Sequence, residues 1–174
     1  MTISSASQTW TIQFCNPPPT ELRKGHKPTM GIAVRVTTQG PPFICARNPS
    51  VFVWLHDKAS GRRVPELQGT TTQQILSRDA DAANGVSFFD DLSILRNGAY
   101  ELRFQVMYLN AADMLAPGSN ILTWHVAVTD TAPVQQTGSH QHAQALRELI
   151  PHLSGRLTID RINQWEQKGA PETH

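Results

Sequence analysis

Long apolar runs and an excess of one charge sign are both missing from this chain. No apolar stretch approaches the roughly 18–20 residues that a membrane-spanning helix needs, and the opening segment MTISSASQTW lacks the basic and apolar regions of a signal peptide. The 15 basic and 14 acidic residues leave a formal net charge of +1. Because such a balance creates no general attraction for nucleic acid, any DNA site must be a local patch. A soluble intracellular protein without a membrane partner is expected.

Cysteine is also scarce, with only Cys15 and Cys45 in the chain. Two thiols in a chain of this size more often stay free in a reducing compartment than form a structural disulfide. Recognisable catalytic motifs are missing too: there is no nucleophile elbow and no glycine-rich phosphate loop. The sequence therefore predicts neither an enzyme nor a bound cofactor.

Two groups of side chains suggest a metal site but lack the remaining ligands. Asp79, Asp81, Asp90 and Asp91 do not have the rest of a calcium-loop pattern, so solvated loop acids are the favoured interpretation. Three histidines near the end of the chain have no cysteine nearby to complete a zinc site, which favours ordinary surface residues: His140, His142 and His152. No metal is expected.

The strongest structural signal is the alternation of apolar and polar residues from Tyr100 to Leu109. Every second side chain is apolar, which is typical of a strand with one buried face. Asn97-Gly98 in front of it is a turn signal, and residues 88–94 resemble a second short strand. The two strands are predicted to form a hairpin at the centre of an antiparallel sheet.

Further strands are predicted along most of the chain. Alternation indicates strands over 10–14, 32–36 and 121–128, and one short strand is expected around 73–76. Residues 51–55 are apolar at every position, which predicts a strand buried on both faces. Residues 1–8 are expected to be flexible, 9–170 to form one domain, and 171–174 to be a tail.

The end of the chain changes from strand to helix patterns. Residues 141–150 contain almost no β-branched side chain and stop at Pro151, and residues 157–168 repeat apolar side chains at helical spacing before Gly169. Strands followed by helices predict a mainly β protein, an antiparallel β-sandwich with one or two C-terminal helices packed on it.

Two short segments concentrate positive charge. Arg23, Lys24, His26 and Lys27 surround Gly25 in a polar loop, and residues 58–63 (KASGRR) are predicted to be the tip of a hairpin. Cations in such loops can follow a DNA backbone, but solvated charged loops are the commoner outcome. Arg62 and Arg63 are the candidate contacts in the second segment.

Several of these segments, in this order, resemble the fungal velvet domain. The best match is 85–109, where an aromatic pair and Asp-Leu-Ser are followed by Gly98-x-Tyr100-x-Leu102-x-Phe104. The first strand with its proline-rich and basic sequel, Asn48-Pro49, residues 67–69 (Leu-Gln-Gly) and the closing segments 150–157 and 167–169 also resemble the family.

The resemblance implies a fold and a function. Velvet domains have an immunoglobulin-like sandwich related to the Rel-homology fold, and they act as dimeric DNA-binding transcription regulators. It implies a nuclear (and cytoplasmic) protein controlling fungal development, sporulation and secondary metabolism, as a homodimer or a heterodimer with another velvet-family protein. DNA contacts are expected from loops at one end of the domain. The expected residues are Arg23, Lys24, His26, Lys27, Arg47, Arg62 and Arg63.

The basic loop differs from the family pattern, and this leaves a second function open. The family typically has Arg-x-Cys-Gly, Lys-Asp-Arg-Arg and then Asp-Pro-Pro-Pro, whereas this chain has the shorter and less basic ELRKGHKPTMG. The alternative is a velvet-type module that does not bind DNA and acts by heterodimerisation. Its interface would be a sheet face or the last helix with Trp165, although packing of Trp165 on its own sandwich is the simpler interpretation.

Overall fold

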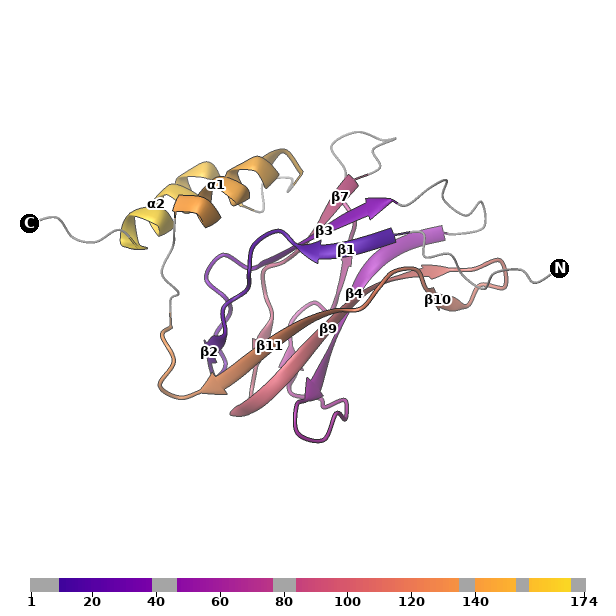
Figure 1. Ribbon diagram of the computed structural model, residues 1–174, viewed down its shortest axis with the longest axis horizontal. Coiled ribbons are helices and arrows are strands. Elements are labelled where there is room, and N and C mark those ends of the chain that lie inside the picture. The colour runs from indigo at the N-terminus through magenta and orange to yellow at the C-terminus, as the bar shows by residue number, and fades with distance from the viewer. Residues whose placement is uncertain (1–9, 39–46, 77–83, 135–139, 153–156, 170–174) are drawn as a thin grey trace, which may run out of the picture.

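The computed structural model describes residues 10–38, 47–76, 84–134, 140–152 and 157–169, which form two packed β-sheets, a small two-stranded sheet and a layer of helices (Figure 1). The strands are β1 Trp10–Phe14, β2 Glu21–Arg23, β3 Ile32–Thr38, β4 Arg47–Asp57, β5 Leu67–Gln68, β6 Thr72–Gln74, β7 Asn84–Phe89, β8 Ser93–Ile94, β9 Gly98–Leu109, β10 Leu115–Pro117 and β11 Leu122–Thr129. The helices are α1 His140–Leu149, the 3-10 turn η1 Ile150–His152 and α2 Ile159–Gly169. The β-sandwich with C-terminal helices expected from the sequence is confirmed.

The larger sheet has the order β2-β11-β9-β4-β6, with β10 added to one end of β9. Its central strand β9 is the one with the clearest alternation, and Leu102, Phe104 and Val106 on its inner face are fully buried. All its pairings are antiparallel except that of β2 with β11. The prediction that residues 100–109 form a half-buried central strand is confirmed.

The smaller sheet has the order β1-β3-β7, and it shows that the predicted hairpin is wrong. β7 pairs with β3, whereas β9 pairs with β4, β10 and β11 in the other sheet. The chain between them forms β8, which pairs with β5. The Asn97-Gly98 signal therefore marks the entry to β9 after a crossing between sheets and does not close a hairpin.

β4 also differs from its prediction, because only one of its faces is buried. Val51, Val53 and Leu55 point into the sandwich, whereas Phe52 and Trp54 are half-buried on the outer face. Their rings stack on each other, with centroids 6.0 Å apart and planes 19° apart. The aromatic pair made the segment look continuously apolar, although this sheet is not covered by the helices.

The helices pack on the outer face of the smaller sheet, so the molecule has two apolar layers (Figure 1). Phe89 is buried in the core between the sheets, and its neighbour Phe88 is buried in the cluster under the helices. Successive side chains of a strand point to opposite faces, so a buried aromatic pair requires cover on both sides of β7. Trp165 is 9% exposed in the second cluster, as the simpler interpretation predicts.

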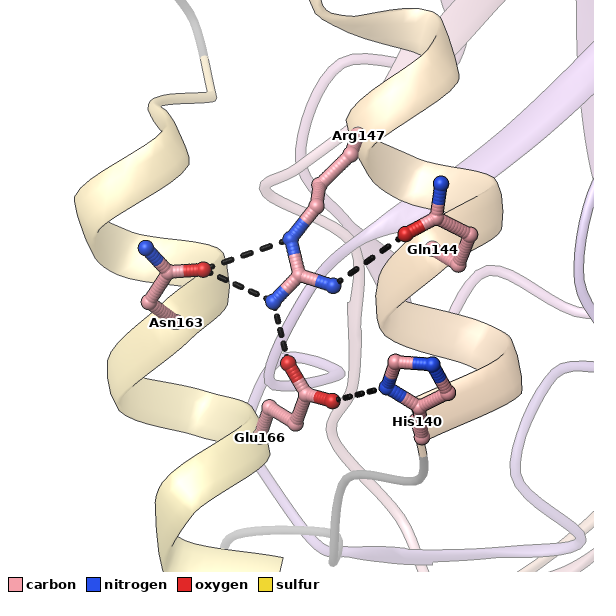
Figure 2. A network of polar contacts seen from close by, with 5 residues as sticks. All are labelled: His140, Gln144, Arg147, Asn163 and Glu166. Atoms are coloured by element: carbon pink, nitrogen blue, oxygen red, sulfur yellow. Dashed lines mark hydrogen bonds and ion pairs between the residues drawn. The ribbon is translucent and has the colours of Figure 1, made fainter.

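A polar network joins the two helices on the side away from the sheet (Figure 2). Arg147 of α1 donates from Nη2 to Asn163 Oδ1 of α2 at 2.7 Å, and it also forms an ion pair with Glu166. The other carboxylate oxygen of Glu166 lies 2.6 Å from His140 Nδ1. The hydrogen bonds from Arg147 and His140 hold the pKa of Glu166 below its ordinary value. Neither described helix has the length and apolar composition to cross a membrane.

Cys15 lies at the end of β1, partly buried against the cluster under the helices. Burial raises the pKa of its thiol to about 11, against the opposing effect of the nearby Arg35 guanidinium. Cys45 is outside the described residues. The thiol of Cys15 is therefore expected to be almost entirely protonated at neutral pH.

This pKa predicts slow alkylation of the folded protein. In a Cys45→Ser variant at pH 8, iodoacetamide should modify Cys15 roughly a hundredfold more slowly in the folded state than in urea, because only the thiolate reacts. The rate should rise about tenfold per pH unit up to the pKa. Mass spectrometry of quenched samples measures both rates. Equal rates in the two states at pH 8 would contradict the buried position.

Candidate nucleic-acid interface

The topology brings the two basic segments predicted from the sequence to the same end of the sandwich. β2 ends at Arg23 beside the end of β11, which pairs with the start of β9. β9 in turn pairs there with the end of β4, where residues 58–63 begin. In Figure 1, β2 and the loop after β4 both lie along the lower side of the molecule. Because neighbouring strands lie about 4.8 Å apart, three strand spacings separate β2 and β4 by roughly 14 Å.

Two of the predicted residues in the first segment are engaged in holding it in place. Arg23 is half-buried, and its Nε donates to the carbonyl of Ala132 at 2.6 Å. The Lys24 ammonium lies 3.2 Å from Asp130, and the backbone N–H of Lys24 donates to Thr129. The amide of Asn97 and the charge of Lys24 hold the pKa of Asp130 below its ordinary value. These contacts fix the loop against the chain that follows β11.

The other two residues of this segment are placed for external contacts. His26 and Lys27 are exposed, and the backbone N–H of His26 donates to Arg23 O at 3.0 Å in a tight turn. The preceding N–H of Gly25 donates to Ile94 O at 2.8 Å, which ties the turn to β8. The side chains of His26 and Lys27 thus extend into solvent from a turn whose backbone is held by hydrogen bonds to β2 and to β8.

The second segment is a tight hairpin tip, as predicted. Asp57 accepts a hydrogen bond from the N–H of Ser60 at 2.9 Å, and its own N–H donates to Arg62 O at 2.8 Å. The hydrogen bonds from Ser60 hold the pKa of Asp57 below its ordinary value. Arg62 and Arg63 are exposed, and the Arg63 guanidinium carbon lies 6.0 Å from the centre of the Trp54 ring.

Arg47 does not belong to this group. Its backbone pairs with Leu109 at the start of β4, whereas the hairpin tip follows the end of that strand. An eleven-residue strand is roughly 35 Å long, so Arg47 lies at the opposite end of the sheet. The resemblance placed it among the DNA contacts, but the direction of β4 separates it from the rest.

Arg96 was not among the residues predicted from the sequence, but it lies at the same end as the two basic segments. It follows β8 just before β9, its side chain is 75% exposed, and its guanidinium lies 3.6 Å from Glu66. Its position just before the Asn97-Gly98 turn signal could have predicted an exposed side chain at the start of the central strand. Only the sheet topology shows that this position adjoins the hairpin after β4.

Acidic side chains are interleaved with these cations. Asp130 pairs with Lys24, Glu66 with Arg96, and Asp57 lies within the hairpin tip. Asp91 is close enough to Lys27 for that charge to contribute to lowering its pKa. Exposed ion pairs contribute little stability, about 0–1 kcal/mol, but they reduce the local positive potential. This end of the sandwich therefore has a few exposed cations with acidic side chains among them.

Metal ligation finds no support among the described residues. They contain no cluster of three or more histidine, cysteine, aspartate or glutamate side chains arranged for a metal ion. Asp79 and Asp81 lie outside the described residues, and the side chain of His152 is not described. Asp91 accepts hydrogen bonds from the N–H and hydroxyl of Thr70, and His140 contacts Glu166.

Comparisons with known proteins add little to this geometry. No family model matches the chain, and no curated protein matches it either. Among solved structures, the cohesin module of a family 33 glycoside hydrolase from Clostridium perfringens ATCC13124 is similar at 6% identity and a TM-score of 0.32. That alignment covers 75% of this chain and 100% of the cohesin module.

Proposed function

We propose that this protein is a velvet-like transcription regulator that binds DNA through the end of the sandwich formed by residues 24–27 and 58–63. The main support for this proposal is the sheet topology. Two segments far apart in the sequence expose Lys27, Arg62 and Arg63 at the same end of the larger sheet. The strands that lead into them, β2 and β4, are roughly 14 Å apart, which is comparable to the width of the major groove, about 12 Å. The two segments would contact phosphates on either side of one groove.

The interleaved acids define what kind of binding is expected. Lys24 and Arg96 already form ion pairs with acidic side chains. Only a few exposed cations therefore remain to neutralise phosphates. Such contacts give affinity that depends on salt and carry little sequence information. A dimer would double their number, which fits the proposed role as a homodimer or as a heterodimer with another velvet protein in the nucleus. The proposed processes are development, sporulation and secondary metabolism.

The proposal predicts a loss of DNA affinity on neutralising the hairpin tip. An Arg62→Gln/Arg63→Gln variant should bind mixed-sequence duplex DNA at least about tenfold more weakly, and the slope of log affinity against log salt should fall by about two. Lys27→Gln should lower the same slope by about one. Fluorescence anisotropy between 50 and 200 mM salt, roughly the range over which such contacts weaken strongly, measures both effects.

A control variant with the same change in net charge shows whether the lost affinity comes from local contacts with DNA or from the overall charge of the protein. Arg47→Gln/Arg103→Gln removes two cations from the opposite end and from the outer sheet face. This variant should bind DNA like the parent protein. An equal loss of affinity in both double variants would contradict a local interface, and no binding by the folded parent protein would rule out DNA binding by this chain alone.

The second candidate function is a velvet-type interaction module without its own DNA contacts. The observation in its favour is the outer face of the larger sheet, where Phe52 and Trp54 stack beside Arg63. Aromatic side chains with a neighbouring arginine are typical of the centres of protein interfaces. The anisotropy experiment decides between the two functions, because the module alone would leave DNA unbound at every salt concentration.

A further inference from the structure

The helical layer and the first basic segment enclose a cleft that the proposed DNA contact does not use fully. Its volume is about 490 Å³. One wall is the chain from Gly25 to Met30, and the other is α2 with the residue Val134 before the helices. A neighbouring cavity of about 220 Å³ has four lining residues in common with it, so the two adjoin. The shared residues are Pro28, Thr29, Met30 and Trp165.

Positive charge is concentrated on the rim of this cleft. Lys27 of the loop and Arg161 of the first turn of α2 carry this charge, His26 precedes Lys27 in the loop, and Asp90 is the one acidic residue among those that line the cleft. Arg161 Nη2 donates to the carbonyl of Thr29 at 3.2 Å, which bridges the two walls. A guanidinium has five N–H donors, so this bond positions Arg161 while leaving donors for a ligand.

The cleft has an apolar side as well. Trp165 and Met30, each 9% exposed, form its base together with Pro28, and Val134 at the edge is 43% exposed. Methionine adapts its shape to what it packs against, and an indole provides a flat apolar surface. A cationic rim above an indole and a thioether favours a ligand with an anionic group at one end and an apolar, preferably aromatic, body.

We propose that this cleft binds a small organic anion, with its carboxylate or sulfonate beside Lys27 and Arg161 and its apolar body against Trp165 and Met30. The volume falls within the roughly 300–1,000 Å³ typical of small-molecule sites. A duplex is far too wide to reach the indole at the base, so the site is distinct from the proposed DNA contact. It goes beyond that function and does not depend on it, although Lys27 belongs to both.

The test uses 1-anilinonaphthalene-8-sulfonate as an anionic aromatic probe and N-phenyl-1-naphthylamine as its neutral counterpart, with the folded full chain and no DNA. The sulfonate should bind at one saturable site, and the neutral probe should bind roughly tenfold more weakly, because it lacks the charged contacts. Lys27→Gln and Arg161→Gln should each weaken sulfonate binding about threefold to tenfold without changing the binding of the neutral probe.

Two controls locate the binding. Arg62→Gln removes an exposed cation outside the cleft and should leave sulfonate binding unchanged. Trp165→Phe keeps an aromatic ring and should selectively lower energy transfer from tryptophan to the bound probe. Unchanged thermal unfolding of each variant shows that the fold is retained, since a loosened core also binds such probes.

Equal binding of the two probes, or sulfonate binding that Lys27→Gln and Arg161→Gln leave unchanged, would overturn the proposal, and so would an equal loss of sulfonate binding in Arg62→Gln. So would the lack of saturable binding to the folded parent protein. Because no DNA is present, these outcomes are independent of whether the anisotropy experiment supports the proposed function.

Discussion

Replacing Phe104 by alanine is expected to lower the free energy of unfolding by about 3–5 kcal/mol, the usual cost of removing a buried aromatic ring. Phe104 is completely buried on the central strand β9. Its ring centroid lies 5.5 Å from that of Phe14 and 5.4 Å from that of Phe89, both edge-on. Since those two rings come from β1 and β7, Phe104 of the larger sheet makes ring contacts with both edge strands of the smaller one.

The matched control is Phe52→Ala in the neighbouring strand. Phe52 is half-buried on the outer face and stacks only on Trp54 among the ring contacts described, so its loss should cost about 1 kcal/mol. Urea unfolding followed by circular dichroism measures both changes. Since domains are commonly stable by only about 5–15 kcal/mol, the Phe104 variant should be partly unfolded in mild urea. Similar losses in the two variants would contradict the central position of Phe104.

The sequence was most informative where local pattern and tertiary burial coincide. Residues 100–106 alternate strictly between apolar and polar side chains because β9 has one face in the core, and this could be read directly. The two helices were also predictable, because each has a stop signal at its end. The short strand around 73–76 was found in part, as β6 with Leu76 bridged to Val86.

The errors occurred where pairing joins distant segments. The predicted hairpin used the turn signal at Asn97-Gly98, but β7 pairs with β3, some fifty residues earlier in the chain. Local turn propensity carries no information about which sheet a strand joins. Phe88 and Phe89 were predicted to belong to a short strand and were noted as a motif, but the helical layer that covers Phe88 on the smaller sheet was not inferred from their opposite directions.

The candidate interface also depends on pairing between distant segments, which the sequence does not show. Both basic segments were visible in the sequence, but their common location depends on the β2-β11-β9-β4 order, which no local pattern reveals. The distinction between structural and exposed cations was also hidden, because the partner of Arg23 is 109 residues away. Arg47 was grouped with the other cations for the same reason, although the direction of β4 puts it at the other end of the sheet. Residue type predicted the chemistry, and topology determined which side chains can act together.

Replacing Gly69 by alanine is the second change expected to have a large effect. Gly69 has a φ of 115°, which disfavours any residue with a Cβ, and an added Cβ would lie 2.3 Å from the backbone oxygen of Asp91. The strained backbone costs about 1–3 kcal/mol and the forced displacement a similar amount, so the expected loss of stability is about 3 kcal/mol or more. Urea unfolding again measures the change.

The reason for this close approach is the pairing of β5 with β8. Thr70 donates its N–H to the Asp91 carboxylate at 3.0 Å and its hydroxyl at 2.6 Å. Burial alone would raise the pKa of Asp91, but the hydrogen bonds from Thr70, with smaller effects from a backbone amide and Lys27, hold it below the ordinary value. The stability from this contact is therefore present above the ordinary carboxyl pKa and is lost as pH falls through the lower folded value.

Gly61→Ala is the control for Gly69→Ala, because it changes a glycine with a positive φ that has no close contact. Gly61 has a φ of 70°, but an added Cβ would meet nothing within 4 Å. Its replacement should therefore cost only the conformational penalty, about 1–2 kcal/mol. The difference between the two variants measures the steric effect at Asp91. If both lose the same stability, the close packing of residues 67–69 on β8 is wrong, and with it the physical reason why a glycine follows Leu67-Gln68 in this chain.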